Sequence, residues 1–203
     1  MTDSTAKNKK HKASMQKQKA MVDASIEAAS DKGGIAILLT GDGKGKTSSA
    51  FGMVIRALGY GHKVGVVQFI KGEQLSGEEL YVRDHCPQVT FYQMGTGFTW
   101  DTQDREADIV AAERTWAQVE PMLLDSSYDL VVLDELTYML AYQYLDGSMI
   151  IDAINNRPKQ QSVVVTGRGG GSAQQEIMDT VSEVKSIKHA FDSGITARKG
   201  VDY

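Results

Sequence analysis

The chain has 203 residues, of which 41% are hydrophobic and 24% charged, with a formal net charge of −4. This balance is typical of one soluble α/β domain, and the acidic charge argues against a general attraction to nucleic acid. The single cysteine, Cys86, cannot form an internal disulfide, so we expect it to be structural. No run approaches the roughly 18 apolar residues of a membrane span, and no secretory signal is present, so we expect a cytoplasmic protein without a membrane partner.

Residues 1–33 differ in character from the rest of the chain. Lysines fill the stretch from residue 7 to residue 19 without an intervening acid. The spacing of apolar residues predicts a helix over 13–29 whose apolar stripe is too thin to stand alone in water. We therefore expect a basic, mobile N-terminal arm and helix, residues 1–33, followed by a domain over 34–203. The alternative is that the lysines contact RNA or DNA.

A glycine-rich loop, residues 40–47, lies between a strand predicted over 35–39 and a helix predicted over 48–58. A strand that turns through glycines into a helix lets backbone N–H groups converge on phosphate oxygens, and the helix dipole favours the negative charge. The pattern predicts a phosphate-binding loop, and the alternative is a plain glycine turn.

Two side chains of this loop carry chemistry. Lys46 would supply a mobile cation, and Thr47 a hydroxyl for a phosphate-bound Mg²⁺. Counted from Gly41, the loop is one residue shorter than the usual phosphate-binding pattern. Its sequence alone therefore leaves the orientation of a bound triphosphate open.

The remaining elements alternate between strands and helices. Apolar, β-branched runs predict strands over 63–70, 89–94, 130–133 and 162–166, and helical spacing predicts helices near 78–84, 104–124, 147–156 and 173–181. Five strands alternating with helices predict a doubly wound, mainly parallel sheet of the RecA-like nucleotide-binding type. Ligands of such sheets bind at the carboxyl ends of the strands, so we expect the ligand-binding residues to follow the strands directly.

Functional side chains follow three of these strands. Asp134 and Glu135 follow the strand over 130–133, and one of them could serve a Mg²⁺ opposite Thr47 or simply cap the next helix. Arg168 stands among glycines after the strand over 162–166, where its guanidinium could bind phosphate. The glycine-flanked stretch 95–100 carries two aromatics, which are either core residues or contacts to a flat, apolar ligand.

Taken together, these blocks resemble the bacterial ATP:corrinoid adenosyltransferases of the phosphate-loop type. The resemblance runs from about residue 35 to residue 203, and six blocks occur in the order found in that family. They are residues 41–47, 65–72, 96–100 with 105–108, 131–138, 166–169, and 189–191 with 200–203. The shortened loop is the form that this family shows, although Asp42 stands where an asparagine is expected.

The resemblance implies transfer of the 5′-deoxyadenosyl group of ATP to Co(I) of a reduced corrinoid, with release of triphosphate. The corrinoid would be cobalamin, cobinamide or cobyrinic acid diamide. Mapping the family's motif onto this sequence assigns the triphosphate to Gly41, Asp42, Gly43, Lys44, Gly45, Lys46, Thr47 and Ser48, with Arg168 as a further contact. The same mapping assigns a divalent ion, Mg²⁺ or Mn²⁺, to Thr47 and Glu135.

Further roles follow from the resemblance alone. Phe98 and Trp100 match the aromatics that remove the lower ligand of the corrinoid cobalt, which makes Co(II) easier to reduce. The N-terminal helix would close over the active site, and the enzyme would be a homodimer. A reduced flavin or a flavodoxin-type protein would supply the electron.

Two readings from other classes compete with this one. A generic phosphate-loop ATPase or phosphotransferase accounts for the loop and the acids but leaves Phe98, Trp100 and the C-terminal block unexplained. A nucleotide-dependent nucleic-acid-binding module would use the lysine-rich arm, but the acidic net charge argues against it.

Overall fold

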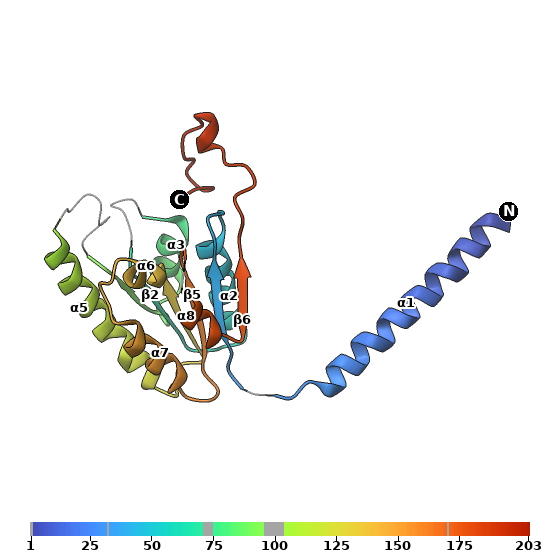
Figure 1. Cartoon of the computed structure of the whole chain (residues 1–203), viewed down its shortest axis with the longest axis horizontal. Coiled ribbons are helices and arrows are strands. Elements are labelled where there is room, and N and C mark those ends of the chain that lie inside the picture. The colour runs from blue at the N-terminus through green and yellow to red at the C-terminus, as the bar shows by residue number, and fades with distance from the viewer. Residues whose placement is uncertain (1, 32, 71–74, 96–103, 170) are drawn as a thin grey trace. The chain divides into compact units, whose positions relative to one another are not determined.

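The computed structural model describes residues 2–31, 33–70, 75–95, 104–169 and 171–203. It divides into two compact units, Met1–Lys32 and Gly33–Tyr203. The first unit is a single helix, α1 (Thr2–Ala28), which begins eleven residues earlier than the sequence predicted (Figure 1). Its described side chains are exposed, apolar ones included.

The second unit is built on a six-stranded, all-parallel sheet, which confirms the predicted doubly wound α/β class. The strand order is β3-β2-β4-β5-β1-β6. The strands are β1 (Ala36–Thr40), β2 (Val64–Gln68), β3 (Thr90–Gln93), β4 (Leu130–Asp134), β5 (Ser162–Thr166) and β6 (Thr180–Glu183). Each of the five predicted strands is present, with ends within two residues of the prediction.

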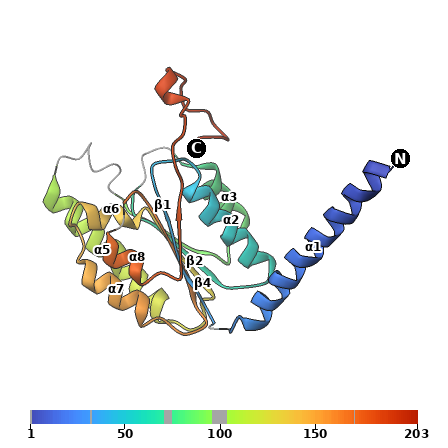
Figure 2. The ribbon, with the colours of Figure 1, turned by 45° about the vertical axis from the view of Figure 1, so that its right-hand side comes forward.

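Helices cover both faces of this sheet (Figure 2). One face packs on α2 (Lys46–Gly59) and α3 (Gly77–His85), and the other on α5 (Arg105–Leu124), α6 (Leu136–Ala141) and α7 (Gly147–Asn155). The two resulting cores are centred on side chains such as Phe51 and Phe69, each of which contributes about 1.5–3 kcal/mol by burial. Cys86 is a buried free thiol in the first of these cores, consistent with a structural role.

The predicted helix over 173–181 is wrong in its second half. A short helix, α8 (Ser172–Glu176), is followed by strand β6, which pairs in parallel with β1. All four residues of β6 are exposed, so burial left no apolar pattern in the sequence to reveal it. Backbone pairing defines the strand instead: Asp179 N–H donates to Ala36 O over 2.9 Å, and Val184 N–H donates to Thr40 O over 2.8 Å.

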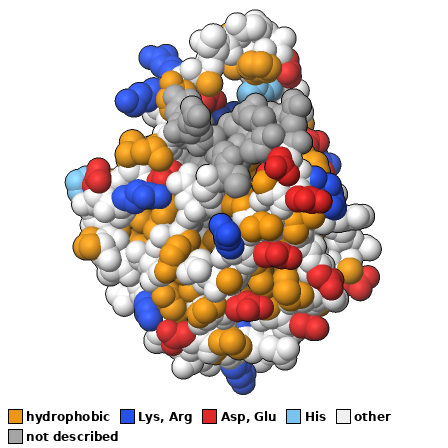
Figure 3. Space-filling model, turned by 90° about the vertical axis from the view of Figure 1, so that its left-hand side faces the viewer, with side chains coloured by type: hydrophobic (Ala, Val, Ile, Leu, Met, Phe, Trp, Pro, Cys, Tyr) orange, Lys and Arg blue, Asp and Glu red, His pale blue; other side chains and the backbone are white. Residues whose placement is uncertain are grey.

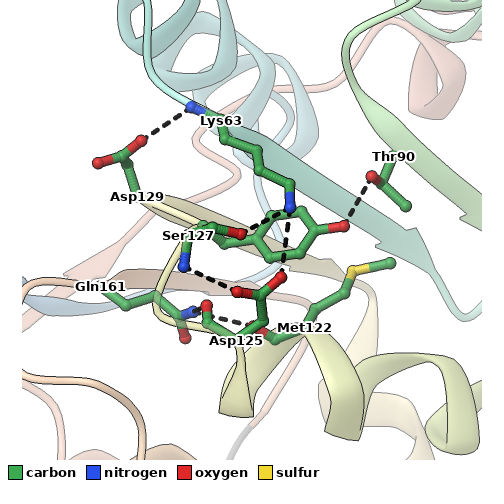
Figure 4. Close-up of polar contacts among 8 residues, drawn as sticks. Lys63, Thr90, Met122, Asp125, Ser127, Asp129 and Gln161 are labelled. Atoms are coloured by element: carbon green, nitrogen blue, oxygen red, sulfur yellow. Dashed lines mark hydrogen bonds and ion pairs between the residues drawn. The ribbon is translucent and has the colours of Figure 1, made fainter.

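Polar contacts join neighbouring strands at the edge of the sheet where the strands begin (Figure 4). The Lys63 ammonium lies 3.9 Å from the centre of the Tyr128 ring, and the Tyr128 hydroxyl is 2.7 Å from Thr90 Oγ1. Lys63 N–H also donates to Asp129 over 2.8 Å. These contacts join the beginnings of β2, β3 and β4 and add to the backbone pairing that sets the register of these strands.

The surface over α5 and α7 mixes acidic and apolar side chains rather than gathering either kind (Figure 3). Val110 and Leu124 of α5 are among its exposed apolar residues. No helix in the described part of the chain is both long and apolar enough to cross a membrane.

Candidate active site at the carboxyl edge of the sheet

The glycine-rich loop, residues 40–47, joins β1 to α2 and packs closely on the chain that follows β6. Gly41 and Gly45 have φ values of 97° and 110°, the left-handed region that favours glycine. A Cβ atom at Gly41 would lie 2.5 Å from Val184 O, and Gly43 N–H donates to that carbonyl over 2.7 Å. Gly41 is therefore required both by its conformation and by the neighbouring backbone, whereas Gly45 is required by its conformation alone.

Lys46 is held inside this loop. Its ammonium donates to Gly41 O over 2.7 Å and to Gly43 O over 2.9 Å, and the residue is 7% exposed. Burial lowers the pKa of Lys46 below its ordinary value of 10.5, and the charge of Glu135 opposes that shift. An anion bound in the loop would offer the ammonium charged acceptors in place of two carbonyl oxygens.

Thr47 and Asp134 meet at the centre of the site. Thr47 Oγ1 donates to Asp134 Oδ1 over 3.0 Å, and Asp134 is 1% exposed. The same carboxylate accepts from Thr166 Oγ1 over 2.6 Å and from Gln68 Nε2 over 2.8 Å. Asp134 therefore links the first turn of α2 to the carboxyl ends of β2, β4 and β5.

Glu135 leaves the strand with φ of 60° and precedes α6, so its side chain lies apart from that of Asp134. Its N–H donates to Thr166 Oγ1 over 3.0 Å, and its side chain lines the cavity described below. The two acids thus divide the roles that the sequence left open, because Asp134 contacts Thr47 and Glu135 faces the cavity.

The donor set fits a metal that arrives with a nucleotide. Among the described residues there is no cluster of three or more histidine, cysteine or acidic side chains that could hold a metal by itself. Magnesium in nucleotide sites usually takes one or two protein oxygens, and phosphates and waters complete its octahedron. The Thr47 hydroxyl and the neighbouring Glu135 and Asp134 carboxylates supply oxygens of this kind.

Two threonine hydroxyls fix the loop that carries Arg168. Thr137 Oγ1 donates to Arg168 O over 2.8 Å, and Thr40 Oγ1 donates to Gly169 O. Gly167 has φ of 140°, and a Cβ atom there would collide with the Thr137 hydroxyl. The two hydrogen bonds anchor the backbone of an arginine that was expected on a flexible loop. Its guanidinium lies 4.0 Å from the Asp42 carboxylate.

A cavity of about 690 Å³ lies at this edge of the sheet. It brings together every predicted triphosphate-binding residue except Gly41, whose carbonyl instead holds Lys46. The cavity is lined by residues 42–48, Ile70, 76–78, Glu135, Tyr138, Arg168, His189 and 200–203. Ser48 Oγ donates to Glu78 Oε1 over 3.0 Å at its rim. Phe98 and Trp100 lie outside the described residues.

Sequence reasoning missed several residues that position the site. Gln68 and Thr166 hold Asp134, and Thr137 holds the Arg168 loop. Gln68 had a visible signal, since it is a polar residue at the end of an otherwise apolar strand. Asp202, which forms a 2.7 Å ion pair with Lys44, had none beyond its place in the C-terminal block.

Comparison with known proteins now places the fold and cavity in a family. A family model described as ATP:corrinoid adenosyltransferase BtuR/CobO/CobP matches residues 32–203, which include the whole cavity. The chain belongs to the ATP:corrinoid adenosyltransferase family.

Relatives of this family cover nearly the whole chain. A corrinoid adenosyltransferase of Escherichia coli K12 is 52% identical over 188 residues, covering 93% of this chain and 95% of its own length. One from Pseudomonas aeruginosa is 48% identical over 100% of both chains, and one from Salmonella typhimurium is 50% identical over 93% of this chain and 95% of its own. Membership in the family identifies the enzyme class, ATP-dependent adenosylation of corrinoids, and disfavours the generic phosphotransferase alternative.

Proposed function

We propose that this chain transfers the 5′-deoxyadenosyl group of ATP to Co(I) of a reduced corrinoid and releases triphosphate. The observation that carries the proposal is the match of the corrinoid adenosyltransferase model to the residues that line the cavity around the glycine-rich loop. The cations Lys46 and Arg168 both face that cavity, as a polyphosphate ligand requires.

The reaction needs no covalent intermediate with the protein. The electron pair of Co(I) attacks C5′ of the ribose, a cobalt–carbon bond forms, and the C5′–O bond breaks. The electron pair of the broken bond leaves with the triphosphate. The protein needs to hold the leaving group with cations and backbone donors, and it needs no nucleophile of its own.

The loop residues 41–48 would bind the triphosphate, with Lys46 exchanging its two carbonyl partners for phosphate oxygens. Arg168 would reach the same group from the loop after β5. Thr47 and Glu135 would bind Mg²⁺ or Mn²⁺ together with the phosphates, and Asp134 would orient the Thr47 hydroxyl. Support comes from the 3.0 Å contact between Thr47 and Asp134 and from the place of Glu135 in the cavity wall.

Phe98 and Trp100 would form an apolar wall against the lower face of the corrinoid. Displacing the lower axial ligand leaves a four-coordinate Co(II), which accepts an electron more easily. A reduced flavin or a flavodoxin-type protein would supply that electron. Cobalamin, cobinamide and cobyrinic acid diamide are the candidate substrates, and this part of the proposal rests on the sequence blocks alone.

The N-terminal arm and helix, residues 1–33, would act as a cover for the active site, and two copies of the chain would form a homodimer in the cytoplasm. The exposed apolar residues of α1, such as Met21 and Ile26, supply a surface for such docking. An isolated helix with this composition buries nothing, so a partner surface would stabilise it.

One assay tests the central proposal. Purified protein is mixed with MgATP and cobalamin or cobinamide reduced chemically to Co(I), and the absorbance change on forming the cobalt–carbon bond is followed. The phosphate product is analysed in parallel. We expect adenosylated corrinoid and inorganic triphosphate in equal amounts. Orthophosphate without adenosylated corrinoid would identify an ordinary ATPase and overturn the proposal.

A further inference from the structure

The segment after β6, residues 186–203, folds on itself but buries little. One turn closes through backbone bonds from Ser193 and Ile195 N–H to Ala190 O, and a second through a bond from Asp202 N–H to Arg198 O. All of its residues are exposed except His189 and Tyr203, which are partly buried. The segment therefore has little apolar contact to hold it against the domain.

A single ion pair ties this segment to the glycine-rich loop. Lys44 Nζ lies 2.7 Å from Asp202 Oδ1, and the same side chain accepts a 2.7 Å hydrogen bond from Arg198 N–H. Within the described ranges it is the one ion pair or side-chain hydrogen bond between residues 186–203 and the rest of the domain. The hydrogen bond from Lys44 lowers the pKa of the Asp202 carboxyl below its ordinary value.

The pair also determines what borders the cavity. The chain leaves the carboxyl edge of the sheet after β6, turns, and returns to end near the loop before α2 (Figures 1 and 2). His189 and residues 200–203 thereby line the cavity together with Lys44, Lys46 and Arg168. Among the residues that the structure describes, no other ion pair or side-chain hydrogen bond joins residues 200–203 to the rest of the domain.

We infer that Asp202, acting through Lys44, holds residues 186–203 as the outer wall of the nucleotide cavity and is a positioning residue for triphosphate binding. This inference rests on the proposed function, which places the triphosphate of ATP in the same cavity. The sign of the effect is diagnostic. Removing a carboxylate near a triphosphate would by charge alone tighten binding, whereas loss of a positioning contact weakens it.

Binding and turnover of Asp202→Asn and Asp202→Glu test the inference. Because exposed ion pairs are weak, we expect Asp202→Asn to raise the Kd for inorganic triphosphate and the KM for ATP by up to about fivefold, with kcat unchanged. Asp202→Glu keeps the charge and should restore both constants. Unchanged or tighter binding by Asp202→Asn would overturn the inference.

A second measurement needs no nucleotide. Limited trypsin digestion followed by mass spectrometry reports cleavage after Arg198 and Lys199, which lie in the turn that Asp202 closes. Cleavage should be several times faster in Asp202→Asn than in wild type or Asp202→Glu. High salt should accelerate it in wild type and in Asp202→Glu but not in Asp202→Asn, because salt screens the pair. Equal rates in all three proteins would contradict the role of the pair.

The two proposals fail separately. If the protein binds triphosphate but forms no adenosylated corrinoid, the proposed function is wrong. The Asp202 measurements then still test whether this residue holds residues 186–203 at the cavity. If adenosylation is normal and Asp202→Asn matches wild type in binding and in digestion, only the inference about the wall falls.

Discussion

Thr47 Oγ1 donates a hydrogen bond to the buried Asp134 carboxylate over 3.0 Å, which couples the first turn of α2 to the end of β4. Asp134 accepts two further hydrogen bonds, from Thr166 and Gln68, so its two oxygens face three donors. The Thr47 hydroxyl is thus held in one orientation, as a metal ligand in a nucleotide site needs to be.

Asp134→Asn should damage both stability and metal use. An amide N–H₂ in place of one carboxylate oxygen would face a donor, either the Gln68 amide or the two threonine hydroxyls. We expect a loss of about 1–3 kcal/mol in the free energy of unfolding, measured by urea titration. The Mg²⁺ concentration for half-maximal adenosylation should rise about 10- to 100-fold.

Glu135→Gln is the matched comparison, because this neighbouring acid lines the cavity outside the Asp134 hydrogen bonds. It should raise the metal requirement while leaving the urea midpoint close to wild type. A Glu135→Gln protein with normal metal dependence would remove Glu135 from the proposed metal site.

The lowered pKa of Lys46 predicts a decline of activity at alkaline pH. The ammonium binds phosphate only when protonated, so kcat/KM for ATP should fall as pH rises through an apparent pKa below 10.5. Lys46→Arg keeps its charge and should remove the decline, whereas Lys46→Ala should lose activity with any corrinoid. A decline centred at 10.5 or above would contradict the effect of burial.

The same shift has a consequence for the free protein. Between the lowered pKa and 10.5, the unfolded chain binds more protons at Lys46 than the folded chain does. The contribution of Lys46 to the free energy of unfolding therefore rises with pH across that window.

Gly167→Ala should displace the Arg168 loop. The new methyl group would require an unfavourable φ and would collide with the Thr137 hydroxyl that holds Arg168 O. We expect a loss of about 1–3 kcal/mol in stability and a weaker affinity for ATP, measured by calorimetry. Gly171→Ala is the control, because that glycine has φ of −57° and open space around its Cβ position. Equal effects of the two changes would exclude the proposed anchoring.

Trp100→Ala tests whether the aromatic wall acts on the reduction of Co(II) or on the transfer of the adenosyl group. If the aromatic wall removes the lower ligand of Co(II), the variant should be slow when a flavin-type donor reduces Co(II) and close to normal with chemically supplied Co(I). Phe98→Ala should behave in the same direction. Equal losses in the two assays would show that these aromatics do not act on the cobalt reduction step.

Deletion of residues 1–32 tests the cover. The domain over 33–203 forms its own compact unit, so its melting temperature should stay near that of the full chain. Turnover should fall, because the proposed cover over the reacting groups is gone. Unchanged turnover would remove the helix from the active site, and a loss of nucleic-acid binding on deletion would revive the competing role of the lysines.

The sequence predicts the fold well where burial shapes it. The strands β2, β4 and β5 are nearly continuous apolar runs because helices cover both of their faces. The strand β6 escaped prediction because it is exposed and depends on pairing with β1. An apolar sequence pattern reveals strands that are buried. It does not reveal an edge strand that is held only by backbone hydrogen bonds.

The residues of the candidate site likewise fall into some that the sequence predicted and some that it did not. Lys46 and Thr47 stand in one contiguous motif, and their geometry agrees with that motif. Gln68 and Thr166 act on Asp134 from positions 66 and 32 residues away, and no local spacing encodes such contacts. The alternation of side chains along a strand predicted that Asp134 and Glu135 face different ways. The positive φ that turns Glu135 toward the cavity became visible only in the fold.

The contact between Gly43 and Val184 has a consequence for how the enzyme is made. The glycine-rich loop is synthesised near the beginning of the domain, but the backbone on which it rests comes after the last strand, and so does Asp202. A ribosome-bound chain that lacks β6 has the loop sequence without its support. The ability to hold a nucleotide should therefore emerge late in synthesis, once residues 180–203 have been made.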